Sequence, residues 1–352
     1  MNFFDYITPA NILAYWDNSK ADQTAYMGEM LFPATKIQGL ELSKVGGRAG
    51  LPVRLKASAF DTQATYRDRL SIEVTKQKMP FFRERMKVDE ETRQQILAIS
   101  NDQILRGYVT RIFDDAGNLL RGSRATRERM AMELISTGHV KIDGNGVKLD
   151  YNYNLSRKQN VKASVAWTDP VHSKPIQDLI DWVDYFRTEF HVPMGYVVMN
   201  TKTFNLIKKS ESTIAILYPT ATNIGNQLVT SPQVKDLILN ATGLQVLIND
   251  AAYADEVGGA GKPFYPEGVC TLLPVGGKLG NMVFGTTPEE IDLLTDAKTS
   301  GNTRITDTGV AVYTRLIDHP VNREVIVSQI CLPSFGADVD GGAGSILIAK
   351  ID

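Results

Sequence analysis

The sequence has no long hydrophobic run, no basic leader and no excess of positive charge. No apolar stretch among its 352 residues approaches the roughly 18 that a membrane-spanning helix needs, so we expect no membrane contact. Residues 1–5 carry an acid and no basic cluster, which argues against a secretory signal. The net charge is −2, so the sequence has no basic excess of the kind that gives nucleic-acid-binding proteins a basic surface. A protein that only encloses nucleic acid needs no such surface.

Cysteine is scarce as well. The two cysteines, Cys270 and Cys331, each lie in a short apolar run. That setting favours two buried thiols in a reducing compartment over a disulfide.

The motifs of common enzyme sites are also missing. The four histidines form no pair with the spacing of zinc ligands. The Gly-Lys pairs lack the spaced glycine and the hydroxyl residue of a phosphate-binding loop. Asp178, Asp181 and Asp184 recur along one expected helix, where a solvated face is favoured over a divalent-ion site. We therefore predict no catalytic, cofactor-binding or metal-binding residues.

The most informative pattern that is present is the strict alternation of apolar and polar residues within 51–78. Apolar residues occupy every second position in two runs, with polar residues 61–69 between them. This predicts a two-stranded arm whose strands each reach on the order of 30 Å. An isolated hairpin is marginal in water, so the apolar side of the arm needs cover. A neighbouring molecule usually supplies such cover, which favours an assembly subunit over a free enzyme.

A helix-rich stretch follows the arm. Asp89 is expected to cap a helix that Gly117 and Asn118 interrupt. Ser123 is then expected to cap a second helix, and Gly138 stands where a C′ glycine would end it.

The second of these helices has a charged face that includes Arg124, Arg127 and Glu128. Two interpretations stay open for this face. It is either exposed to solvent or in contact with neighbouring subunits.

The remainder reads as mixed α and β structure. Asp143-Gly144-Asn145-Gly146 predicts the turn of a hairpin over residues 140–153. Residues 167–318 have an α/β character, and strands are expected at 324–332 and 346–351. We expect these last two strands to pair with the hairpin, so that 167–318 is an insertion in an α+β domain.

Four short stretches of sequence stand out within this order of elements. They are Leu31-Phe32-Pro33-Ala34-Thr35-Lys36, Ser136-Thr137-Gly138 with the hairpin after it, Asp318-His319-Pro320-Val321-Asn322-Arg323-Glu324 and Gln329-Ile330-Cys331-Leu332-Pro333. The order of elements resembles the Hong Kong 97-type fold of tailed-phage major capsid proteins. The four stretches are similar to those of one branch of it, the lambda-type major capsid protein E family.

The resemblance implies four segments of a Hong Kong 97-like α+β fold. Residues 1–38 would form an N-terminal arm, and residues 39–80 a strand and the extended E-loop arm. Residues 81–166 with 319–352 would form a peripheral domain with a long helix and a β-sheet. Residues 167–318 would form the inserted α/β axial domain.

The function that the resemblance implies is that of a major capsid protein, not an enzyme. Copies would form the hexamers and pentamers of an icosahedral phage head that encloses double-stranded DNA, assembled in the host cytoplasm. Because the arm begins close to Met1, a separate scaffolding protein is expected, together with a portal protein and a decoration protein. An encapsulin-like shell protein is the alternative, and a two-domain α/β enzyme is less favoured.

The same reasoning gives candidate subunit-interface residues, which are charged and lie on the arm or on the long helix. They are Arg54, Lys56, Arg67, Asp68, Arg69, Glu73, Arg124, Arg127 and Glu128.

Overall fold

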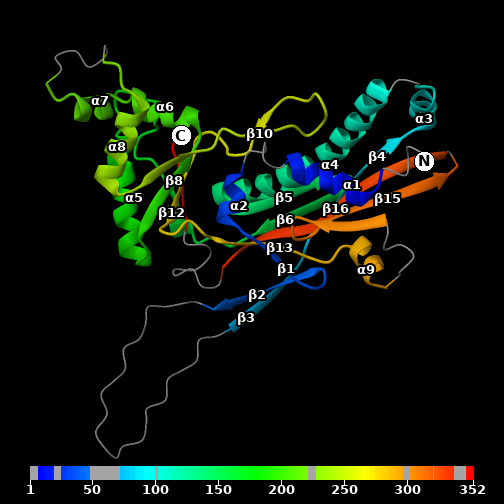
Figure 1. The fold of residues 1–352 in the computed structure, drawn as a ribbon. Coiled ribbons are helices and arrows are strands. Elements are labelled where there is room, and N and C mark those ends of the chain that lie inside the picture. Colours follow the sequence, from blue (N-terminus) through cyan, green and yellow to red (C-terminus); the bar gives the residue numbers. More distant parts are fainter. Residues whose placement is uncertain are drawn as a thin grey trace, which may run out of the picture. The chain divides into compact units, whose positions relative to one another are not determined.

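A computed structural model shows a mixed α+β chain (Figure 1). It describes residues 7–19, 25–47, 72–99, 102–220, 227–295, 302–319, 321–336 and 346–352. Contacts divide the chain into two compact units. The first comprises residues 1–42, 77–130 and 281–334, and the second comprises residues 43–76, 131–280 and 335–352.

The first unit is built on a mixed sheet with the strand order β1-β13-β16-β15-β14, in which β4 also pairs with β16. The strands are β1 (Ala34–Lys36), β4 (Phe81–Val88), β13 (Gly280–Phe284), β14 (Thr303–Thr306), β15 (Val310–Asp318) and β16 (Val321–Phe335). Strand β16 is long and almost wholly buried, and its alternate residues face opposite sides of the sheet. Its central position explains why it accepts partners along both edges.

Strand β4 lies at an edge of this sheet. Its eight residues pair with β16, and no other described strand pairs with it. Arg83, Arg85 and Lys87 occupy alternate positions and are exposed. Arg85 and Arg315 both form ion pairs with the buried carboxylate of Glu324, at 3.2 and 2.8 Å.

Among the described residues, five helices belong wholly or partly to the first unit. They are α1 (Pro9–Ser19), α2 (Met27–Leu31), α3 (Glu90–Leu97), α4 (Asp102–Thr137) and α9 (Pro288–Thr295). The expected interruption at Gly117 and Asn118 is wrong, because α4 runs without a break for 36 residues. Ser123 is accordingly no cap, and its hydroxyl donates to the Leu120 carbonyl at 2.8 Å. Tertiary packing overrides the local glycine signal, since the indole of buried Trp16 lies 3.9 Å from the site of a Gly117 Cβ.

The second unit has its own five-stranded sheet, with the order β7-β17-β12-β8-β9. The strands are β7 (Asn160–Lys162), β8 (Met194–Met199), β9 (Gln245–Ile248), β12 (Val269–Pro274) and β17 (Leu347–Lys350). Helices α5 (Pro175–Phe190), α6 (Thr201–Lys209), α7 (Glu211–Leu217) and α8 (Ser231–Thr242) lie near it in Figure 1. Apolar residues of these helices and strands form one buried cluster that includes Trp182, Phe186 and Phe204.

The hairpin expected over residues 140–153 is present, but the strands expected beside it pair elsewhere. The hairpin is confirmed as β5 (His139–Gly144) and β6 (Val147–Asn152), with Asn145 and Gly146 both at positive φ as its two-residue turn requires. The expected pairing of the last strands with this hairpin is wrong. Strand β17 pairs with β12 and β7, and β16 pairs within the first sheet.

Smaller elements complete the described chain. They are the 3-10 helix at Arg157–Gln159, the pair β10 (Ala252–Tyr253) and β11 (Lys262–Pro263), and the pair β2 (Glu41–Gly47) and β3 (Ile72–Lys78). The first predicted strand of the arm lies outside the described residues, and β3 coincides with the end of the second. No helix in the described part of the chain is long and apolar enough to cross a membrane.

Gly138 ends α4 as predicted. Its φ is +76°, its amide donates to the Leu134 carbonyl at 2.8 Å, and an added Cβ would lie 2.6 Å from the Leu155 side chain.

We expect Gly138→Ala to lower the free energy of unfolding of the subunit by about 1–3 kcal/mol, because alanine tolerates neither this φ nor this contact. Gly122→Ala is the matched control, because Gly122 is exposed in the middle of α4 with open space around it. It should raise the free energy of unfolding by about 0.5–1 kcal/mol. Equal effects of the two changes in urea unfolding would contradict this account.

The two cysteines are free and buried, as the sequence predicts. Burial raises the pKa of the Cys331 thiol to about 12 and also raises that of the Cys270 thiol, so both thiols stay protonated at neutral pH. We expect a thiol reagent such as Ellman's reagent to label neither cysteine in the native subunit at pH 8. Both should react at once in concentrated urea. Fast labelling of the native subunit would refute the burial of these residues.

Candidate functional site

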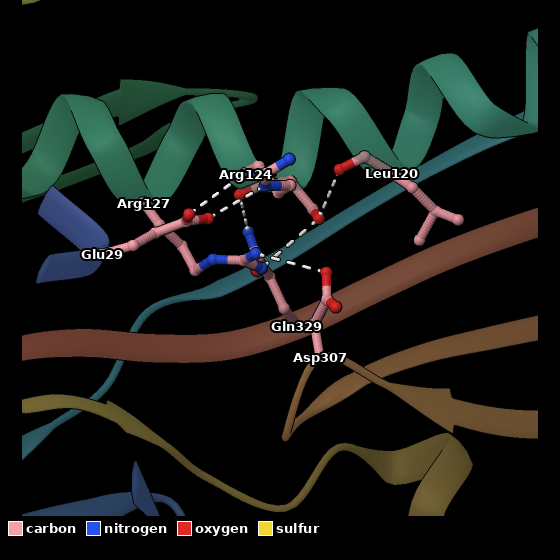
Figure 2. Close-up of polar contacts among 7 residues, drawn as sticks. Glu29, Leu120, Arg124, Arg127, Asp307 and Gln329 are labelled. Carbon is pink, nitrogen blue, oxygen red and sulfur yellow. Dashed lines mark hydrogen bonds and ion pairs between the residues drawn. The ribbon is translucent and has the colours of Figure 1, made fainter. Parts of the chain in front are cut away.

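Arg127 is buried where α4 packs on the sheet of the first unit (Figure 2). Only 7% of the residue is exposed. Its Nη1 donates to Gln329 Oε1 on β16 at 3.0 Å, and its Nη2 lies 3.5 Å from Asp307 Oδ2. Gln329 in turn donates to the Ser123 carbonyl at 3.0 Å, and the Arg127 guanidinium lies over the Phe284 ring. A buried guanidinium needs such partners, so this network ties the helix to one register on the sheet.

Arg124 and Glu128 hold the short helix α2 against α4. Arg124 forms a two-pronged ion pair with Glu29, both N–O distances being 2.9 Å (Figure 2). This hydrogen bonding raises the pKa of the Arg124 guanidinium. The Glu128 carboxylate accepts the Gly28 amide hydrogen at 2.7 Å and is 2% exposed. The contacts explain how five residues keep a helical turn that would not persist alone.

The solvated interpretation of this charged face is therefore wrong for Arg127 and Glu128. Both side chains are buried by residues of their own chain. Their contact with a neighbouring subunit stays a prediction, as does that of Arg124.

A strained turn brings the Asp307 carboxylate next to the buried Arg127 guanidinium. Asp307 and Thr308, between β14 and β15, have φ values of 45° and 71°. Left-handed backbone is uncommon for aspartate and unusual for a β-branched threonine, and it costs of order 1 kcal/mol or more per residue. Gly309 completes the turn, and an added Cβ there would lie 2.7 Å from Phe284. The turn is strained, and its conformation places the Asp307 carboxylate beside Arg127.

These residues surround a cavity of about 380 Å³ within the first unit. Its charged lining is Glu29, Arg124, Arg127, Glu128 and Asp307. The apolar part of its wall includes Phe32, Met282 and Phe284, and Ala34 lines it from an exposed position.

The other predicted site residues lie on the arm. Arg54, Lys56, Arg67, Asp68 and Arg69 are outside the described residues, and Glu73 is on β3. Their place in a subunit interface stays a prediction.

The acidic series does not share one solvated face. Asp178 is 5% exposed and accepts hydrogen bonds from Ser164 Oγ at 2.7 Å and Trp167 Nε1 at 2.8 Å. Asp181 accepts from Gln177, and Asp184 lies 3.6 Å from Arg187. Within the described ranges, no cluster of His, Cys, Asp or Glu has the arrangement of a metal site.

Sequence reasoning did not find Glu29, Asp307 and Gln329. Each comes from a segment far along the chain from its partner on α4, so no local spacing links them. The only local signal was the Asp307-Thr308-Gly309 turn between two strands, which predicts a tight turn but no partner.

Solved structures share this fold. One, from an Escherichia coli CFT073 prophage and described as that of a capsid protein, has a TM-score of 0.59 and 15% sequence identity, with 98% of this chain and 99% of that chain covered. Another, a phage-related protein from Bordetella bronchiseptica RB50, has a TM-score of 0.57 and 12% identity, with 98% and 97% covered. At such identities the likeness concerns the fold alone. The chain has the mixed α+β fold of Hong Kong 97-type capsid proteins.

The family is shown by the sequence itself. The family model for phage major capsid protein E matches residues 8–326, which is most of the chain. This chain belongs to the phage major capsid protein E family. Among curated proteins, none matches it.

Membership of this family makes the chain a structural protein of the phage head rather than an enzyme. It is a component of the virion capsid, in which many copies form an icosahedral shell. The expectation of a capsid protein is confirmed, and neither the encapsulin-like shell nor the two-domain enzyme is its family.

We expect Arg127→Leu to lower the free energy of unfolding by about 3 kcal/mol, because it leaves Asp307 and Gln329 without their buried donor. Arg121→Leu on the same helix is the control. Arg121 is exposed and bonds locally to Asn118, so its loss should cost less than about 0.5 kcal/mol. Denaturant unfolding of the two variants measures the difference. Similar values for both would contradict the role given to the Arg127 network.

Proposed function

We propose that copies of this chain form the hexamers and pentamers of the head around double-stranded DNA, each subunit extending its arm over an adjacent subunit. The chain's membership of the capsid family over residues 8–326 carries this proposal. The division into arm, peripheral and axial domains remains part of it.

The pairing of β2 with β3 supports the arm. These two strands form a sheet of their own, and residues 48–71 connect them. A two-stranded ribbon buries too little surface to be stable in water by itself. A partner surface on the next subunit would supply the missing burial.

The proposed interface uses the charged residues of the arm. Arg54, Lys56, Arg67, Asp68, Arg69 and Glu73 would form ion pairs across the subunit boundary. Each exposed pair contributes only ~0.2–1 kcal/mol, but the shell repeats it in every subunit. On the long helix, Arg124, Arg127 and Glu128 would act by keeping α2 and the Asp307 turn in place behind the contact surface.

The proposed partners follow from the same function. A separate scaffolding protein would guide curvature, a portal protein would occupy one vertex, and a decoration protein would brace the outside. DNA would be enclosed without a specific site, which agrees with a net charge of −2.

Deletion of residues 55–75 tests the proposal. We expect the shortened chain to fold, with the circular dichroism and unfolding midpoint of the intact subunit, but to form no closed shells in negative-stain electron microscopy. The intact chain, expressed with the same scaffolding protein, should give closed shells. Normal shells from the deletion would exclude an essential arm.

A further inference from the structure

We infer that the cavity between α2, α4 and the Asp307 turn is a docking site for a peptide segment of a second protein that carries a lysine or arginine side chain flanked by apolar residues. The inference rests on the proposed function in one respect. A scaffolding partner of the head would supply the segment.

The charge of the cavity selects a cation. Its lining has the three carboxylates of Glu29, Glu128 and Asp307 against the two guanidinium groups of Arg124 and Arg127. Counted by formal charge, the lining therefore has one more carboxylate than guanidinium groups. Both guanidinium groups already bind carboxylates of the chain, so an anionic ligand would have to displace an existing partner.

The carboxylates differ in access. Glu128 is buried, whereas the side chains of Glu29 and Asp307 are 40% and 18% exposed. A carboxylate has two oxygens and accepts several hydrogen bonds, so pairing with arginine does not exhaust it. An incoming ammonium or guanidinium group would therefore meet Glu29 and Asp307 first.

The apolar walls of the cavity match the aliphatic part of a lysine or arginine side chain. Phe32, Met282 and Phe284 are buried beside the charged groups. Lysine and arginine lay their methylene stems along apolar surface while the charged head stays in a polar place. A volume of about 380 Å³ lies at the lower end of the range of ligand pockets, which fits one or two side chains of a peptide.

The turn between β14 and β15 fixes the position of one of these carboxylates at the cavity. Two consecutive non-glycine residues, Asp307 and Thr308, hold left-handed conformations at the edge of the cavity. Strain of this kind is concentrated at functional sites, where it positions a group in advance. Here the positioned group is a partly exposed carboxylate.

The test uses two fluorescein-labelled amphipathic peptides, one of leucine and lysine and the other of leucine and glutamate. Each is titrated with the unassembled full-length chain while fluorescence anisotropy is recorded. We expect the lysine peptide to bind at least tenfold more tightly than the glutamate peptide, and its affinity to fall as salt is added. Equal affinities, preference for the glutamate peptide, or no binding of either would overturn the inference.

Two pairs of variants locate the binding. Ala34→Phe fills the cavity from an exposed strand position, and Thr35→Phe places the same ring on the next exposed residue, which does not line the cavity. The first should reduce lysine-peptide affinity at least tenfold, and the second should leave it unchanged. Unchanged binding to Ala34→Phe would overturn the inference.

The second pair removes one negative charge. Asp307→Asn keeps a residue that tolerates positive φ and should weaken binding up to about fivefold. Asp143→Asn, on the exposed hairpin of the second unit, changes the net charge equally and should have no effect. Equal effects of the two would indicate general attraction to a cationic peptide and would overturn the inference.

Shell formation is read separately by electron microscopy. Shells without peptide binding would refute the docking site and leave the proposed function standing. If the peptide binds the cavity of a chain that forms no shells, the docking site stands and the proposed function is refuted.

Discussion

The guanidinium of Arg127 is buried between a long helix and a sheet, and three separate segments of the chain must meet to satisfy it. Gln329 comes from β16, Asp307 from the turn between β14 and β15, and Phe284 from β13. A charge in this position is costly unless all partners are present. The first unit therefore has a strict requirement on the alignment of α4 with its sheet, and the docking of α2 through Glu29 and Gly28 builds on that alignment.

Local signals in the sequence located many of the elements. The Asp-Gly-Asn-Gly turn and the C′ glycine at Gly138 are both in the structure, because each depends on residues a few positions apart. The predicted break at Gly117 is absent, since the packing of a 36-residue helix outweighs one glycine. The partners of Arg127 and the pairing of β17 with β12 and β7 could not be predicted, because they depend on contacts between remote segments.

In the candidate site, too, local patterns could be predicted and contacts between remote segments could not. Arg124, Arg127 and Glu128 stood out in the sequence as a charged helical face, but the pattern could not tell which side of the helix is buried. Burial of charge contradicts the usual rule for amphipathic helices, and only the carboxylates and amide supplied by other segments make it possible. The family is a structural one and not one of enzymes, so the informative residues of this site are those that fix one segment on another.

The edge strand β4 has a consequence for a protein that the host makes in very many copies. Crowded subunits with open strand edges tend to join sheet to sheet and precipitate before they can build anything. Arg83, Arg85 and Lys87 alternate along β4, so two such strands laid side by side would bring like charges together. Like charges placed opposite one another disfavour the pairing of two such strands, which leaves association to surfaces of more selective shape and charge.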